Sequence, residues 1–154
     1  MRIIGCGDLG RGDDGAGVLV GRRLRELGVP ALLLTGEAAG LLEAFGGCED
    51  VVLVDAVVTG APAGTVWTWE GRPEGLLRRA GSSSHQLGLD VALDLARALG
   101  RLPRRLRIHG IEGKRFGAGE APSPEVLAAV EEVARRIATE AGARSDRGSG
   151  TPLP

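Results

Sequence analysis

A glycine-rich loop near the start of the chain is the first candidate for chemistry. It covers residues 5–17, reads GCGDLGRGDDGAG, and contains the G-x-G-x-x-G spacing that lets a backbone approach a pyrophosphate. Its three aspartates are Asp8, Asp13 and Asp14. Close unit charges in a poorly solvated loop repel an anion by several kcal/mol at an effective dielectric of about 20. The loop therefore favours a cation, and dinucleotide binding through Gly5, Gly7 and Gly10 is the alternative.

The position of the following helix also argues against a phosphate site. Helical periodicity starts near Asp13 or Asp14 and not at Gly10, so a pyrophosphate held by the glycines would lack the dipole of a helix N-terminus. The alternative to a cation site is that Asp13 is only an N-cap and Asp14 only a first-turn acid, two roles that stabilise a helix.

Asp55 and His85 add two further groups that can bind a cation. Asp55 follows the apolar run VVLV, residues 51–54, and so ends a buried strand at the sheet edge where open α/β folds bind ligands. A carboxylate there is costly unless it is paired or coordinates a metal. His85 begins a helix, whose N-terminus disfavours imidazolium and leaves a neutral ring.

Two carboxylates and an imidazole from three loops suit a divalent cation such as zinc or nickel, with positions open for water or substrate. The candidate metal ligands and catalytic residues are Asp14, Asp55 and His85. The alternatives are that Asp55 only caps a loop and that His85 only starts a helix. We assign His109, which stands alone within a strand, a structural role.

Nucleophilic catalysis by a side chain has little support. Ser84 and His85 are adjacent, so their side chains diverge at a helix start, and neither Cys6 nor Cys48 has an evident base. Water is therefore the expected nucleophile in any hydrolysis.

The elements that must position these residues alternate between strand and helix, which predicts an α/β fold around a sheet. The expected strands lie at residues 2–5, 30–37, 49–57, 63–71 and 104–113, and the strand at 63–71 can run antiparallel to its neighbour. The expected helices lie at residues 15–28, 40–47, 82–100 and 123–141.

Two of the predicted helices have distinctive sequence features. The helix at 82–100 is predicted to be amphipathic from four residues at steps of four, namely Leu87, Val91, Leu95 and Leu99. The last helix should open with Ser123 as its cap and Pro124 in its first turn, and end near Ala141. We expect one domain over residues 1–141 and a disordered tail over residues 142–154, which has little apolar content.

Composition limits the classes of partner and the compartment. The 154-residue chain has a net charge of -1 and no long apolar run, so nothing attracts nucleic acid or a membrane. Neither a signal peptide nor a disulfide framework is visible. We expect a cytoplasmic monomer with both cysteines reduced.

The combined motifs resemble those of the nickel-iron hydrogenase maturation endopeptidases. GCGDLGRGDDGAG, VVLVDAV, SSSHQLGL and HGIEGKRFGAGEAPSPEV occur in that family's order over roughly residues 1–140. The resemblance implies a three-layer α/β sandwich with a twisted, mostly parallel five-stranded sheet. It also implies removal of a C-terminal extension from the hydrogenase large-subunit precursor after nickel insertion.

The same resemblance places that family's metal-contacting positions on Asp14, Asp55 and His85, which would bind nickel or a surrogate such as zinc or cadmium. Asp8 stands where the family usually has Asn. The metal either polarises the scissile carbonyl or serves recognition while a carboxylate acts as general base. A non-catalytic, nickel-sensing assembly factor is the alternative from another functional class.

Overall fold

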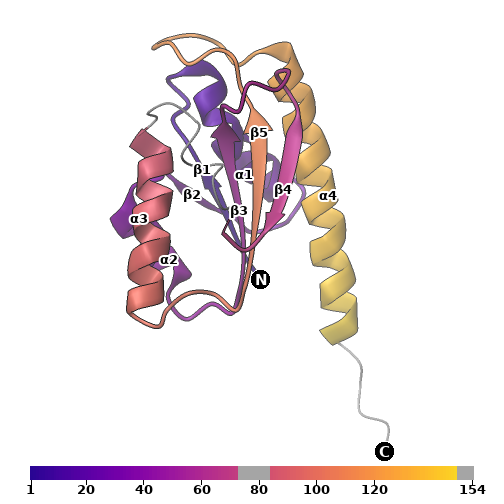
Figure 1. The fold of residues 1–154 in the computed structure, drawn as a ribbon. Helices are drawn as coiled ribbons and strands as arrows, with labels where there is room; N and C mark the ends of the chain where they lie inside the picture. Colours follow the sequence, from indigo (N-terminus) through magenta and orange to yellow (C-terminus); the bar gives the residue numbers. More distant parts are fainter. Residues whose placement is uncertain (73–83, 149–154) are drawn as a thin grey trace, which may run out of the picture.

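The computed structural model describes residues 1–72 and 84–148, with the side chains of residues 84–87 and 146–148 left out of the description. Figure 1 shows a central sheet between two layers of helices. Its elements are β1 Arg2–Cys6, the 3-10 helix η1 Gly12–Gly15, α1 Ala16–Glu26, β2 Leu32–Leu34, α2 Ala38–Phe45, β3 Asp50–Val57, β4 Val66–Glu70, α3 Ser84–Ala98, β5 Arg105–Glu112 and α4 Pro124–Gly148.

The sheet has the strand order β2-β1-β3-β5-β4. All neighbouring strands are parallel except β4, which runs antiparallel to β5. This confirms the predicted α/β class and the direction expected for residues 63–71. Because β1, β3 and β5 are parallel neighbours, their carboxyl ends meet at one edge of the sheet, called here the carboxyl edge.

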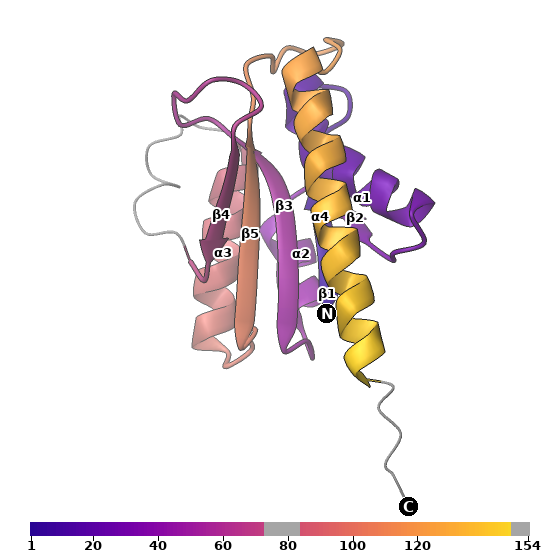
Figure 2. The ribbon, with the colours of Figure 1, turned by 90° about the vertical axis from the view of Figure 1, so that its right-hand side faces the viewer.

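Helices cover both faces of the sheet, so the strands are buried on both sides. Val52 and Val54 of β3 pack into the core with α1 and α4, while Val51 and Leu53 pack with α2 and α3. Figure 2 shows α4 on one side of the sheet and α3 on the other. This alternation is why β3 is a continuous apolar run in the sequence.

Helix α1 lies directly against the sheet because glycines stand at the contact. A Cβ added to Gly17 would lie 2.1 Å from the carbonyl oxygen of Val54 and 2.4 Å from that of Cys6. A Cβ on Gly5 would lie 2.1 Å from the carbonyl oxygen of Gly17. The first and last glycines of the loop, Gly5 and Gly17, therefore serve the packing of helix on strand.

The exposed face of α3 corrects the prediction made from its periodicity. Three residues of the predicted ridge, Val91, Leu95 and Leu99, are 40%, 43% and 56% exposed. The side chain of the fourth, Leu87, lies outside the described residues. The buried residues are Leu89, Ala92, Leu93 and Ala96. The helix is apolar on two faces, and spacing alone does not say which one meets the sheet.

The end of α4 also differs from the prediction. The helix continues past Ala141 to Gly148, so residues 142–148 are helical. Arg144 stabilises this extension, because its guanidinium donates to Glu140 at 3.0 Å and to Asp50 at the start of β3. Residues 149–154 of the predicted tail lie outside the described residues. In the described part of the chain, no helix is long and apolar enough to cross a membrane.

Candidate functional site

The structure brings Asp14 and Asp55 together at the carboxyl edge. Asp55 lies near the end of β3, on the face that packs against α2 and α3, and Asp14 lies in η1 just before α1. Both carboxylates are buried. Burial raises the pKa of Asp55 well above its usual range; the amide of Ala56, 2.8 Å away, lowers it, and the charge of Asp14 raises it further. The two acids therefore form an electrostatically coupled pair.

Cys6 lies at the same place, at the end of β1. Its thiol is buried, and its pKa is raised well above the usual range by burial and by the charge of Asp55. A thiol with a raised pKa stays protonated and is a poor nucleophile. Cys6 is therefore an inert neighbour of the acid pair.

The backbone brings the first turn of α3 to this edge. Gly88 packs against the loop after β2, where an added Cβ would lie 2.2 Å from the carbonyl oxygen of Gly36. His85 lies one helical turn before Gly88, so its backbone belongs to the turn that reaches this edge. Its side chain lies outside the described residues. Its role as a ligand therefore stays a prediction, and among the described side chains no group of three His, Cys, Asp or Glu could hold a metal ion.

Asp13 does not cap a helix, which corrects the interpretation from the sequence. Its fully buried carboxylate accepts hydrogen bonds from the backbone amides of Lys114 (2.8 Å), Arg115 (3.0 Å) and Ser123 (2.6 Å). Ser123 directly precedes α4, as predicted, but its hydroxyl donates to both oxygens of Asp13 at 2.9–3.0 Å. Burial raises the pKa of Asp13, but these donors outweigh it and hold that pKa below its usual value.

These bonds join the loop that carries Asp14 to the loop after β5. The amide of Asp13 donates to the carbonyl of Arg115 at 2.7 Å, and the amide of Gly119 donates to that of Gly10 at 2.7 Å. Arg11 adds a bond from its Nε to the carbonyl of Phe116 at 3.3 Å. The position of Asp14 is therefore set by its neighbour in the chain, the structural acid Asp13.

Glu112 is a second buried structural acid, and the sequence reasoning missed it. It ends β5, and its carboxylate accepts the amides of Thr59 (2.6 Å) and Gly60 (3.0 Å), the hydroxyl of Thr59 (2.8 Å) and the indole N–H of Trp67 (3.3 Å). It thus holds the loop that follows β3. A signal was present in the sequence, since Glu112 is an acid at the end of a buried strand, as Asp55 is.

His109 belongs to the other face of the sheet. Asp55 is paired with Gly110 of β5, so His109, one residue earlier, points away from Asp55. Its Nδ1 lies 3.0 Å from the hydroxyl of Thr68, and burial, with nearby Arg107, lowers its pKa to about 4. This arrangement fits the structural role expected for it.

In the loop whose glycine spacing suggested dinucleotide binding, the space beside the glycines is occupied by the protein itself. Gly7 has a φ of 144°, and an added Cβ would lie 2.0 Å from the carbonyl oxygen of Asp14. The amide of Gly10 donates to the carboxylate of Asp8 at 2.8 Å. These contacts, with those of Gly5, explain the glycines without a phosphate.

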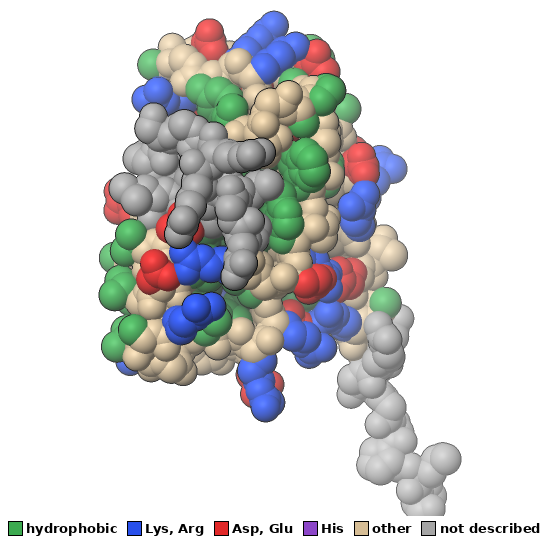
Figure 3. All heavy atoms as spheres, in the orientation of Figure 1, with side chains coloured by type: hydrophobic (Ala, Val, Ile, Leu, Met, Phe, Trp, Pro, Cys, Tyr) green, Lys and Arg blue, Asp and Glu red, His purple; other side chains and the backbone are tan. Residues whose placement is uncertain are grey.

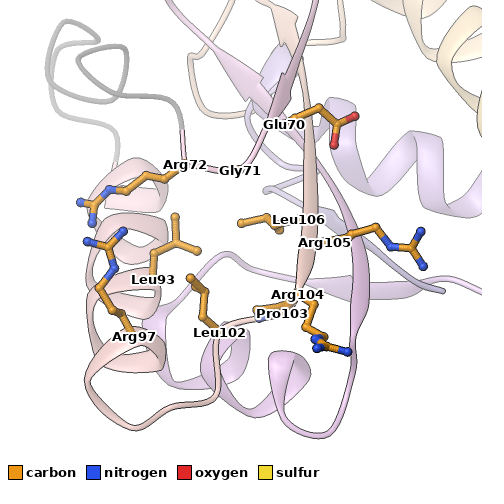
Figure 4. Close-up of a pocket in the computed structure, with 10 residues that line it drawn as sticks. All are labelled: Glu70, Gly71, Arg72, Leu93, Arg97, Leu102, Pro103, Arg104, Arg105 and Leu106. Atoms are coloured by element: carbon orange, nitrogen blue, oxygen red, sulfur yellow. The ribbon is translucent and has the colours of Figure 1, made fainter.

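A pocket of about 370 Å³ lies elsewhere, between α3 and the amino end of β5. Figure 4 shows the side chains of Leu93, Leu102 and Leu106 directed into it, while Arg104 and Arg105 point away. The pocket is at the edge of the sheet opposite to Asp14 and Asp55, so it is not part of the candidate site.

Comparison with known proteins places this chain in a family. The family model HycI, described as hydrogenase maturation protease, matches residues 35–140. The solved [NiFe] hydrogenase maturation protease HybD from Thermococcus kodakarensis is 32% identical, with 91% of this chain and 98% of that chain covered and a TM-score of 0.73.

Two further solved structures are similar. HycI from Thermococcus kodakarensis KOD1 is 27% identical over 90% of both chains, with a TM-score of 0.64. The hydrogenase maturating endopeptidase HybD from E. coli has a TM-score of 0.77 over 97% of this chain and 94% of that chain, and at 24% identity it shows the shared fold. No curated protein matches the chain.

Proposed function

The chain belongs to the hydrogenase maturation protease family, and from this premise we propose that it removes the C-terminal extension of a nickel-iron hydrogenase large-subunit precursor after nickel insertion. The observation that carries the proposal is the pair of buried carboxylates, Asp14 and Asp55, at the edge where the first turn of α3 arrives with His85. Two acids and an imidazole are the donor set that fits a nickel ion.

The acid pair suits a site that is completed by its substrate. Burial is the main cause of the raised pKa of Asp55, and repulsion by the charge of Asp14 raises that pKa further. The nickel of a loaded precursor would relieve the repulsion, whereas a nickel-free precursor would not. Asp14, Asp55 and His85 would then contact the nickel, or a surrogate divalent metal such as zinc.

Water is the nucleophile in the proposed reaction. The protonated thiol of Cys6 supports this, because the nearest sulfur to the acid pair is in its unreactive form. We favour a route in which the metal polarises the scissile carbonyl. In the second route the metal serves recognition only, and a carboxylate takes a proton from the attacking water.

In the first experiment, the purified protein is incubated with nickel-loaded or nickel-free precursor, at a ratio of one part protein to roughly fifty parts precursor. The intact mass of the precursor is then measured. Loss of a defined C-terminal peptide from the loaded precursor alone is expected. Stable binding without cleavage of any cognate precursor would favour the nickel-sensing assembly factor, which has to be present in equal amount.

Variants then assign the site. Asp14→Asn, Asp55→Asn and His85→Ala are each expected to block cleavage and to leave the fold intact. Glu49→Gln is the control, since it removes a carboxylate charge that is 79% exposed at the start of β3, far from the carboxyl edge. Normal cleavage by any folded site variant would remove that residue from the site.

The proposal includes a compartment and an oligomeric state. Both cysteines are free thiols, which fits the reducing cytoplasm. We propose that the protease acts there as a monomer, and gel filtration that gave a dimer mass would overturn the second statement.

A further inference from the structure

The outward face of α3 is apolar although nothing in the core requires it. Val91, Leu95 and Leu99 follow one another at steps of four, so their side chains form one ridge along the helix. Between Val91 and Leu99 the only charged residues are Asp94 and Arg97. The helix is already held to the sheet through other residues, Leu89, Ala92, Leu93 and Ala96. A contiguous exposed apolar strip of this kind marks an interaction surface.

The strip starts beside the proposed site. Val91 is six residues after His85, which is about 9 Å along the helix axis, and the ridge runs from there away from the carboxyl edge. Figure 3 shows hydrophobic side chains along the edge of the molecule formed by α3. A large partner that reaches Asp14 and Asp55 would therefore also meet this face.

The size of the strip favours a transient partner over a second copy of the chain. A stable interface buries about 800 Å² on each partner, and a few half-exposed aliphatic side chains supply only part of that. A protease must release its product, so a small apolar contact suits a substrate better than a permanent subunit.

We propose that the outward face of α3, formed by Val91, Leu95 and Leu99, is the docking surface for the folded body of the large-subunit precursor. This inference rests on the proposed function, since it names the surface that holds the same substrate. Docking along α3 would bring the nickel of the precursor to the proposed site at the start of that helix. The outward face of α3 would then bind the precursor, and the residues at the carboxyl edge would carry out the cleavage.

The test compares Leu95→Glu with Leu127→Glu. Leu127 is the matched control, because it is also a leucine on a helix, 48% exposed, and lies on α4, which covers the other face of the sheet. Both variants should melt within a few degrees of the wild type, since both positions are exposed. The readouts are the Kd for the nickel-loaded precursor and the kcat and KM of its cleavage.

The expected result is a Kd and a KM raised at least tenfold in Leu95→Glu, with kcat at saturation unchanged and Leu127→Glu like the wild type. Equal binding by both variants would overturn the docking surface. So would a Leu95→Glu variant that binds precursor normally but loses self-association in sedimentation. If the wild type binds precursor but never cleaves it, and Leu95→Glu weakens that binding, the proposed function fails while the docking surface stands.

Discussion

Replacing Asp13 with asparagine is expected to destabilise the protein by roughly 3–5 kcal/mol, although asparagine has nearly the same shape. Oδ2 of Asp13 accepts two backbone amides and Oδ1 accepts a third, and all three donors are within 3.0 Å. An asparagine amide has one acceptor oxygen, so in either orientation its NH₂ group faces at least one buried N–H.

The magnitude follows from two contributions. One buried donor left without an acceptor costs about 1–3 kcal/mol, and the bonds that remain lose the benefit of a charged acceptor, about 1 kcal/mol each. For a chain of this size that sum lowers the melting temperature by roughly 6–20 °C. The loop after β5 would lose its attachment to the site loop at the same time.

The matched variant is Asp14→Asn, one residue further along the chain. Removing the charge of Asp14 removes a repulsion on Asp55. The unfolding free energy of the Asp14→Asn variant should therefore stay close to that of the wild type, while precursor cleavage is lost. Urea unfolding followed by the fluorescence of Trp67 and Trp69 measures the stability of both variants, and intact mass measures cleavage. An Asp13→Asn variant within about 1 kcal/mol of the wild type, or an equal loss in Asp14→Asn, would refute the division of roles.

Three other predictions test the scaffold. The pKa of His109 is about 4 instead of 6.5, so the unfolded chain binds a proton there before the folded one does as the pH falls. Relative to His109→Gln, the wild type should lose up to about 3 kcal/mol of unfolding free energy between pH 6.5 and 4, and nothing above pH 7. Urea titrations at several pH values measure this. Gly17→Ala should destabilise the fold by at least about 3 kcal/mol, because its methyl group would meet a carbonyl oxygen at 2.1 Å. Its control is Gly40→Ala, at a helix position with open space around it, which should be neutral or stabilising by up to about 1 kcal/mol. Thermal melts measure both glycine variants. Glu112→Gln should cost about 2 kcal/mol in urea unfolding, because a glutamine oxygen that keeps the amides of Thr59 and Gly60 leaves an NH₂ group facing the indole N–H of Trp67. Wild-type stability would contradict that.

The fold class was predictable because it depends on periodicity along the chain. The apolar run of β3 and the alternation of strand with helix indicate a parallel sheet covered on both faces, and the structure has that sheet. The end of α4 was not predictable in the same way. Residues 142–148 are polar, and their helix is stabilised by the pairing of Arg144 with Asp50, which is distant in sequence.

The candidate site shows the same division at the level of single residues. Residue type and the position after a buried strand were enough to select Asp55, and the loop motif was enough to select Asp14. The sequence did not show that Asp13 binds the backbone amides of a distant loop, nor did it identify Glu112. Those roles depend on which donors lie beside each carboxylate, and the donors come from residues 59–67 and 114–123.

By itself, the sequence determined the alternation of elements and the position of Asp55 at the carboxyl edge, because both follow from local spacing and strand polarity. Only the tertiary structure decided which acids are held by backbone amides and which form a coupled pair. It also decided which apolar face of α3 is buried. Burial and hydrogen bonding depend on neighbours from distant parts of the chain, and the spacing of residues along one segment carries no information about them.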